Sequence, residues 1–210
     1  MNHYRLYHVL FVVISLFVSC SSPQLDRTGF SPQDHYKFGL NWIGAHDFQR
    51  AEFSFKKAVE LDSNFGDAYI QLGLVYYILY EKEVSSTKNP DTIMQYYNSA
   101  YNCFTKGLKC GSKNPQAYTG IARLQKVANR FDKAIESLLK AHELTEPDDI
   151  TTEIIIHYEL GDCYLAQGKY KEALAEYKEY LELVPTSQEH ENIENVIKEI
   201  EKQLGISSPR

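Results

Sequence analysis

One spacing pattern recurs four times in this sequence and constrains the fold more than any other feature. In the stretch LGDCYLAQGKYKEALAEY, residues 160–177, small and bulky side chains stand at fixed intervals. Aligned on Ala173 of this stretch, matching segments surround Ala51, Ala100 and Ala134, each with a bulky residue four positions later. Upstream of each alanine, a partner segment also recurs as FGLNW, LGLVY, IARLQ and LGDCY. Each copy therefore consists of the same two kinds of segment in the same order.

Helix packing explains why small residues stand at these positions. Two helices approach closely only where the side chains between them are small, so Gly161 and Ala173 would allow close contact between two helix backbones. Bulky residues such as Leu160 and Tyr177 fill the volume around that contact. A single helix pair cannot cover its own apolar face, so we expect successive pairs to stack.

The pattern resembles the tetratricopeptide repeat (TPR) family, whose unit is a helix pair of about 34 residues. The resemblance implies an all-α solenoid of about four helix-turn-helix repeats with a C-terminal capping helix. The repeats are expected at residues 32–65, 66–114, 115–148 and 154–186. The second repeat is 15 residues longer than the first (49 − 34), and the extra residues lie between Tyr80 and Tyr97. We expect both helices of that pair to continue by about two turns, either as a plain solvent loop or as an arm for docking or oligomerisation.

The capping helix is predicted over residues 187–204. Its apolar residues recur at steps of four and three, which places them on one side of a helix: Ile193, Ile197, Ile200 and Leu204. Thr186 and Glu189 fit a capping box at its start. The alternative is a free helix that binds a partner. Residues 205–210 form a tail.

The N-terminal segment predicts export. An apolar run over residues 9–18 follows Arg5 and is about half of the roughly 20 residues that a membrane-spanning helix needs. That length is typical of the core of a signal peptide. The run ends in Phe17-Val18-Ser19-Cys20, which resembles the lipobox of bacterial lipoproteins, although that box usually starts with Leu.

The lipobox resemblance implies cleavage of a signal peptide, residues 1–19, and acylation of Cys20. Two or more acyl chains anchor a protein stably, whereas one does not. Residues 20–31 would then be the lipidated cysteine and a flexible tether. An ordinary signal peptidase site would prefer a small residue at position 17. Because Ser21 rather than aspartate follows Cys20, we expect the outer membrane, with the protein facing the periplasm.

Signals for catalysis, metals and nucleic acids are absent from the sequence. Without residues 1–19, 21 basic and 28 acidic residues leave a net charge of −7 (21 − 28), and no basic block offers a site for phosphates. The histidines are scattered, and Cys103, Cys110 and Cys163 form no C-x-x-C pair. No zinc, phosphate-loop, nucleophile-elbow or dinucleotide motif occurs. We therefore expect a protein that is not an enzyme and has no cofactor, no metal and no nucleic-acid partner.

The TPR resemblance places a partner-binding groove on the concave side, which the first helix of each repeat lines. The family's groove positions map onto Tyr36, Leu40, Ile43, Ile70, Leu74, Tyr77, Arg123, Lys126, Tyr158 and Asp162. The first half of this set is apolar and the third repeat is basic. Such a strip predicts an amphipathic or extended peptide with an acidic end. Trp42 is expected in the core instead.

The leading hypothesis is a membrane-anchored TPR lipoprotein that acts as a protein-protein interaction adaptor in the bacterial envelope. Roles in pilus or secretin assembly, or in outer-membrane protein assembly, rest on analogy of fold alone. One alternative is a lipid-anchored small-ligand or glycan binder for nutrient uptake, in which Tyr36 and Tyr77 stack on sugars. Another is self-assembly through the arm of the second repeat. The sequence leaves the oligomeric state open.

Overall fold

The computed structural model describes residues 26–86, 89–184 and 188–205. Within these ranges the chain is helical and contains no strand, which confirms the predicted all-α class. The helices are α2 (Pro32–Gly44), α3 (Phe48–Leu61), α4 (Gly66–Ser85), α5 (Pro90–Lys109), α6 (Pro115–Val127), α7 (Phe131–Leu144), α8 (Ile150–Ala166), α9 (Tyr170–Leu183) and α10 (Gln188–Gln203).

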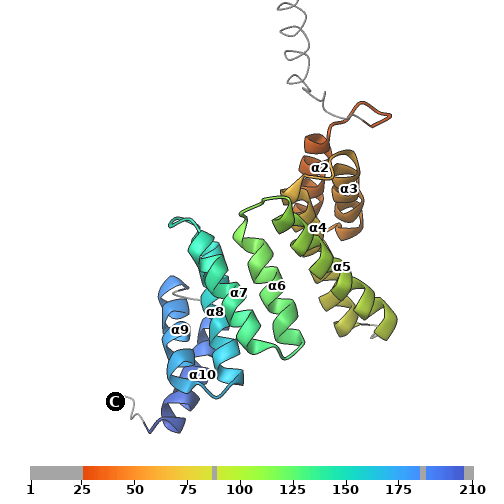
Figure 1. Cartoon of the computed structure of the whole chain (residues 1–210). Helices are drawn as coiled ribbons and strands as arrows, with labels where there is room; N and C mark the ends of the chain where they lie inside the picture. The colour runs from red at the N-terminus through yellow and green to blue at the C-terminus, as the bar shows by residue number, and fades with distance from the viewer. Residues whose placement is uncertain (1–25, 87–88, 185–187, 206–210) are drawn as a thin grey trace, which may run out of the picture.

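The helices form antiparallel pairs that stack in single file (Figure 1). The pairs are α2 with α3, α4 with α5, α6 with α7, and α8 with α9, and the second helix of each pair contacts the first helix of the next. The first helices α4, α6 and α8 also touch their neighbours in the series. Helices α2 and α10 therefore lie at opposite ends of one continuous array.

Local sequence signals fix where the helices begin. Ser31 and Asp34 form a capping box at the start of α2, with the Asp34 carboxylate accepting from the Ser31 backbone N–H at 2.9 Å. Helices α2, α4 and α6 begin at residues 32, 66 and 115, where the first three repeats were expected to start. Helix α8 begins at Ile150, capped by Asp149, so part of the expected connector before residue 154 is helical.

A glycine on the first helix faces a large ring from the second helix in three of the four pairs. A Cβ atom at Gly39 would lie 2.5 Å from Phe55, and one at Gly161 would lie 2.5 Å from Tyr177. In the second pair, Gly73 has the same relation to Phe104 at 2.8 Å. The third pair has Ala122 at this position, opposite Leu138, and both side chains are buried. The predicted packing role of the small residues is thus present in each pair.

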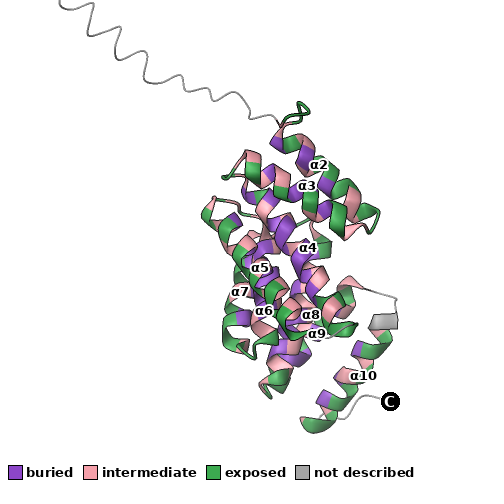
Figure 2. Ribbon diagram, turned by 90° about the vertical axis from the view of Figure 1, so that its right-hand side faces the viewer, coloured by how far each residue is buried: buried purple, intermediate pink, exposed green. Residues whose placement is uncertain are grey.

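Buried residues lie on the inner faces of the helices along the array, and exposed residues lie on the outside (Figure 2). At the C-terminal end, Ile193, Ile197 and Ile200 of α10 are buried against Tyr177 and Tyr180 of α9. Helix α10 therefore caps the fourth pair, as predicted. Of the predicted capping box, Thr186 and the side chain of Glu189 lie outside the described residues.

The second pair projects beyond its neighbours. Helices α4 and α5 contain 20 residues each, whereas α2 and α3 contain 13 and 14. The extra residues thus lengthen both helices, as the sequence predicted. Val84 and Met94, near the far ends of these helices, are exposed.

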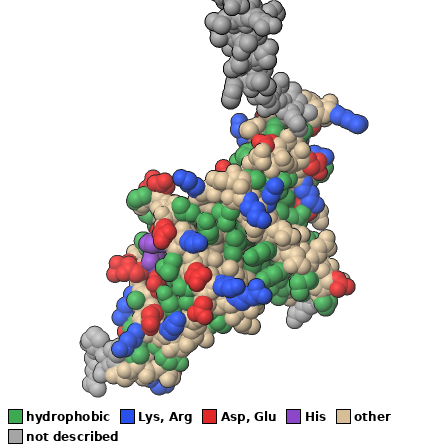
Figure 3. Space-filling view, in the orientation of Figure 1, with side chains coloured by type: hydrophobic (Ala, Val, Ile, Leu, Met, Phe, Trp, Pro, Cys, Tyr) green, Lys and Arg blue, Asp and Glu red, His purple; other side chains and the backbone are tan. Residues whose placement is uncertain are grey.

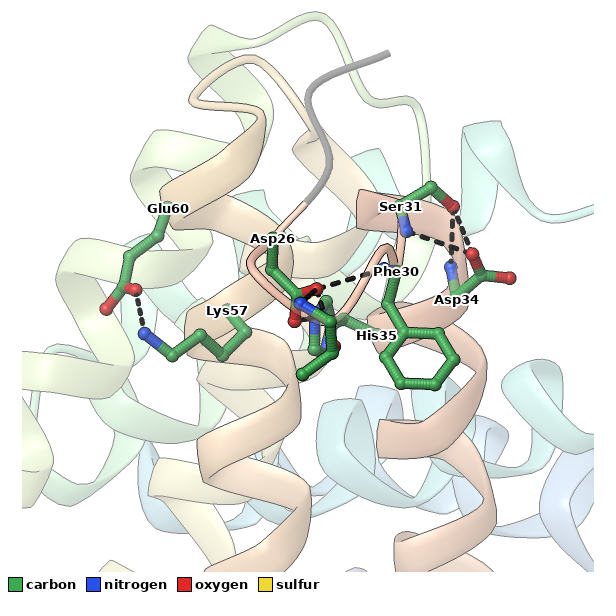
Figure 4. A network of polar contacts seen from close by, with 8 residues as sticks. Asp26, Phe30, Ser31, Asp34, His35, Lys57 and Glu60 are labelled. Atoms are coloured by element: carbon green, nitrogen blue, oxygen red, sulfur yellow. Dashed lines mark hydrogen bonds and ion pairs between the residues drawn. The ribbon is translucent and has the colours of Figure 1, made fainter.

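The predicted flexible tether is partly folded. The Asp26 carboxylate accepts from the backbone N–H groups of Thr28, at 2.8 Å, and Phe30, at 2.9 Å, and lies 2.9 Å from Nε2 of the buried His35 (Figure 4). Residues 26–30 therefore form a turn held against α2, and the expectation of a flexible segment up to residue 31 is wrong for this part. Residues 1–25, including Cys20, lie outside the described ranges. No described helix is long and apolar enough to cross a membrane.

A histidine lies between carboxylates at the junction of the third and fourth pairs. His157 Nδ1 is 2.8 Å from Glu176 of α9, and its Nε2 is 3.6 Å from Glu153, which also pairs with His142 of α7. The hydrogen bond to Glu176, opposed by burial and aided by the surrounding glutamates, raises the pKa of His157 above its usual value. The charged form of His157 therefore stabilises this junction.

The raised pKa predicts that this stabilisation depends on pH. A group whose pKa is higher in the folded state stabilises the fold fully below its unfolded pKa of about 6.5, and this contribution is lost as pH rises through the folded value. His157→Gln should therefore lower the free energy of unfolding more at about pH 5.5 than at about pH 8.5. Urea denaturation followed by circular dichroism measures the difference. An equal effect at both pH values would show that the ion pairs contribute nothing.

The glycine contacts predict opposite effects of alanine at two positions of α2. Gly39→Ala should lower the free energy of unfolding by about 1–3 kcal/mol, because the new methyl group overlaps the Phe55 ring. Gly44→Ala is the matched control: among the described residues, nothing beyond its chain neighbours and its own helix backbone lies within 4 Å of its Cβ position, so stability should be unchanged or higher by up to about 1 kcal/mol. If both variants unfold at the same urea concentration, the close approach does not limit packing.

Candidate partner-binding surface

The predicted groove residues all lie on the first helices of the pairs. Eight of them are partly exposed, and we call this set the first-helix surface: Tyr36, Leu40, Ile43, Leu74, Arg123, Lys126, Tyr158 and Asp162. On the face shown in Figure 3, hydrophobic side chains form patches across the middle of the molecule, with charged side chains between them.

Two predicted contact residues belong to the core instead. Ile70 has no exposed surface, because Gly107 of α5 has no side chain and leaves the space that Ile70 occupies. Tyr77 is 8% exposed and its ring lies 6.0 Å from that of Tyr80. The prediction that these two side chains touch a partner is therefore corrected: Ile70 cannot contact a partner, and only a small part of the Tyr77 surface is accessible to one.

The apolar half of the first-helix surface lies on α2 and α4. Leu40 is 40% exposed, and Ile43 and Leu74 are half-buried. Tyr36 is held in place by ring contacts to Phe55 and Phe65, at 5.7 and 5.1 Å between centroids. This part of the surface therefore combines an ordered ring with aliphatic side chains that water still reaches.

The other half of the surface carries charges that are already paired. Arg123 Nε lies 2.7 Å from Glu159 Oε1, and Lys126 Nζ lies 2.5 Å from Glu159 Oε2. Lys126 also pairs with Asp162 at 2.8 Å. The sequence predicted a basic third repeat that would attract an acidic peptide end. The structure corrects this: two carboxylates from α8 neutralise the two cations of α6, and we call these four residues the α6–α8 charge cluster.

Attraction between opposite charges and a hydrogen bond from the Tyr177 hydroxyl hold the α6–α8 charge cluster together. Burial would lower the pKa of Lys126, but attraction to Glu159 and hydrogen bonds to both carboxylates outweigh burial and raise it. Asp162 accepts a 2.8 Å hydrogen bond from the hydroxyl of Tyr177, whose pKa is raised by burial and then by Asp162 itself. Lys126 therefore stays charged and Tyr177 stays protonated at neutral pH.

Glu159 is the member of this cluster that sequence reasoning missed. Its side chain is buried, and it lies three residues before Asp162, almost one turn away on the same face of α8. The sequence signal that could have found it is an acidic residue three positions before Asp162, on the same face of the helix. The sequence alone does not show which residues of the preceding repeat it faces, because a connector of irregular length separates the two repeats.

A separate pocket of about 680 Å³ lies at the N-terminal end, between α2, α3 and the turn at residues 26–30. Trp42 lines this pocket and is half-buried, so the expectation that Trp42 lies in the core is only partly met. Phe38 and Phe53 line it too and are exposed. Residue positions from the repeat pattern did not single out this pocket.

No group of His, Cys, Asp and Glu suited to a metal ion occurs among the described residues. Cys103 and Cys163 are free thiols, and burial raises their pKa values to about 12 and about 11. At neutral pH both are therefore protonated, in a form that is a poor nucleophile.

Known structures and one family model identify the fold. Residues 154–187 match the family model described as Tetratricopeptide repeat. TTC0263, a TPR protein of Thermus thermophilus, superposes with a TM-score of 0.61 at 19% identity, over 81% of each chain. The fold is a TPR solenoid. MamA gives a TM-score of 0.60 at 18% identity over 83% of each chain. YrrB, a TPR protein with an unusual peptide-binding site, gives 0.58 at 21%, covering 83% of this chain and 78% of its own. No curated protein sequence matches the chain significantly.

The α6–α8 charge cluster predicts a stability cost for removing its buried carboxylate. Glu159→Gln keeps the size of the side chain but leaves Arg123 and Lys126 with less negative charge, and should lower the free energy of unfolding by about 1–3 kcal/mol. The control is Glu136→Gln on α7, an exposed position, where a change within about 0.5 kcal/mol is expected. Equal unfolding midpoints for both variants in urea would contradict the stabilising role.

Proposed function

We propose that this chain is an adaptor of a bacterial envelope, attached to a membrane through Cys20, that binds another protein on its first-helix surface. The TPR fold suggests a protein-protein interaction adaptor, and the solved TPR protein YrrB has a peptide-binding site. The membrane attachment rests on the lipobox resemblance at residues 17–20, and the outer membrane is favoured by Ser21. Assembly of secretins, pili or outer-membrane proteins stays an analogy of fold.

The observation that carries the binding proposal is the exposed apolar half of the first-helix surface. Leu40 keeps 40% of its surface in water, and Ile43 on the same helix and Leu74 on the next first helix, α4, are half-buried. Apolar side chains that gather at a surface mark sites for partners. The charged side chains of the α6–α8 charge cluster already pair with one another. We therefore propose that the partner offers an amphipathic or extended segment held by apolar contacts, without the acidic end that the sequence suggested.

The geometry gives no support to the sugar-binding alternative. That hypothesis needs the faces of Tyr36 and Tyr77 free to stack on a sugar. Tyr77 is buried with Arg123 5.7 Å from its ring centre, and Tyr36 packs on Phe55 and Phe65. The adaptor is therefore the better-supported function.

The proposal predicts that a charge at Leu40 abolishes partner capture. Crosslinking and pull-down from membranes of the native host would compare the intact protein with Leu40→Glu. Leu139→Glu is the matched control, because Leu139 is 45% exposed but lies on the second helix α7. One envelope protein should be captured by the intact protein and by the control, and lost with Leu40→Glu. If both glutamate variants capture the same proteins, the first-helix surface is not the binding site.

The salt dependence of the same capture tests the kind of contact. Because the α6–α8 charge cluster is internally paired, capture should change little between about 0.05 and 0.5 M salt, where screening weakens exposed charge pairs. A steep loss of capture at high salt would mean that the partner displaces these ion pairs and binds through charge.

A further inference from the structure

The N-terminal end of the solenoid carries an apolar surface that the adaptor function does not use. We call it the end face: Phe30, Phe38, Trp42 and Phe53, which line the pocket of about 680 Å³. Three of these side chains are exposed, namely Phe30 (43%), Phe38 (37%) and Phe53 (62%). Exposed aromatic rings gathered at one end of the molecule are typical of a surface that contacts another molecule.

Phe38 is exposed because no described helix covers it from the N-terminal side. The residues that follow the repeat pattern at this position in the other three copies are 3–9% exposed: Leu72, Ile121 and Leu160. Those residues are covered because the preceding helix pair packs against their helix. Among the described residues, no helix pair precedes α2, so Phe38 faces outward.

Phe53 shows that the end face is more than an uncovered repeat. The residues aligned with it, two positions after the repeat alanine, are Asn102, Glu136 and Ala175. Terminal repeats of solenoids normally present a polar outer face, which keeps them soluble. The first repeat instead carries a phenylalanine here, 62% exposed. The sequence has placed an aromatic side chain where a polar one would suit water.

The chain enters the fold beside the end face. The turn at residues 26–30 is fixed by hydrogen bonds of the Asp26 carboxylate and its contact with His35 (Figure 4). The Phe30 ring packs edge-on against that of Phe38, with 5.1 Å between the ring centres. Cys20 lies six residues before Asp26. Six extended residues span at most about 20 Å. A membrane that holds Cys20 is therefore within about 20 Å of this turn.

We propose that the end face rests on the lipid surface, with Phe38, Trp42 and Phe53 among the headgroups. This inference depends on the proposed membrane attachment. Tryptophan and other aromatic side chains favour the membrane interface, where apolar rings and polar groups are both accommodated. Arg50, whose guanidinium lies 4.6 Å from the centre of the Trp42 ring, and Lys57, which also lines the pocket, are cations beside the end face. Each is paired with an exposed carboxylate, Asp47 at 3.4 Å and Glu60 at 2.6 Å, and would exchange that partner for a lipid phosphate. A second copy fits less well, because both copies would turn their end faces toward the bilayer that holds them.

Trp42 provides a direct test because it is the only tryptophan of the sequence. The full-length lipidated protein would be reconstituted into vesicles of phosphatidylethanolamine and phosphatidylglycerol at about 3:1, a surface with anionic lipids. A matched set would carry bromine on the acyl chains near the headgroups, which quenches nearby indole rings. Trp42 should lose most of its emission in the brominated vesicles. Phe53→Glu should restore much of it while the protein still floats with the vesicles, and Leu139→Glu should restore none.

Other outcomes overturn the inference in distinguishable ways. If the protein floats with vesicles but Trp42 emission is the same with and without bromine, the anchor stands and the end face does not touch lipid. If the protein does not float, the proposed attachment fails and this inference falls with it. If Trp42 emission is already blue-shifted in detergent and light scattering shows a doubled mass that Phe53→Glu halves, a second copy covers the end face.

Discussion

The close approach of two helices at a glycine is the contact on which the rest of this structure depends. In three of the four pairs, a ring from the second helix lies where a side chain of the first helix would otherwise be. This contact sets the distance within those three pairs, and the small Ala122 takes the same position in the third pair. The pairs can then stack with their first helices side by side, as α4, α6 and α8 do. On α6 and α8 this packing brings residues of separate repeats into contact, as the α6–α8 charge cluster shows.

The two halves of the first-helix surface differ in the free-energy cost of binding a partner as well as in composition. On α6 and α8, Arg123 and Lys126 pair with Glu159 and Asp162, and replacing those partners with a ligand's carboxylates would leave the buried Glu159 carboxylate unpaired. Such unpaired buried charges are costly. On α2 and α4, the exposed Leu40 and the half-buried Ile43 and Leu74 have apolar side chains, so a partner that covers them displaces no ion pair. This difference supports the proposal that a partner binds at the N-terminal half, while the charge cluster holds α6 and α8 together.

Much of the fold could be predicted from the sequence because the packing residues are local. A glycine and an aromatic residue at fixed offsets specify a helix pair, whatever the loops between pairs contain. The burial of Ile70 could not be predicted, because it depends on Gly107, which lies 37 residues later (107 − 70) in the same lengthened pair. The pairing of Arg123 with Glu159 crosses a boundary between repeats, where the connector has an irregular length. The turn at residues 26–30 depends on one carboxylate whose partners include His35 in the next helix.

The two ends of the solenoid differ in a way that bears on its orientation. At the C-terminal end, α10 buries its isoleucines and turns glutamate and lysine outward, which closes the apolar stack with a polar surface. At the N-terminal end, aromatic side chains remain exposed beside the point where the chain enters the fold. A solenoid surrounded by water would gain from a polar residue at position 53. In the proposed membrane-attached state phenylalanine is favoured at position 53 instead, because its side chain contacts lipid. Leu40 lies on the same helix as Phe38, so a partner would bind close to the membrane, and the capped end would point away from it.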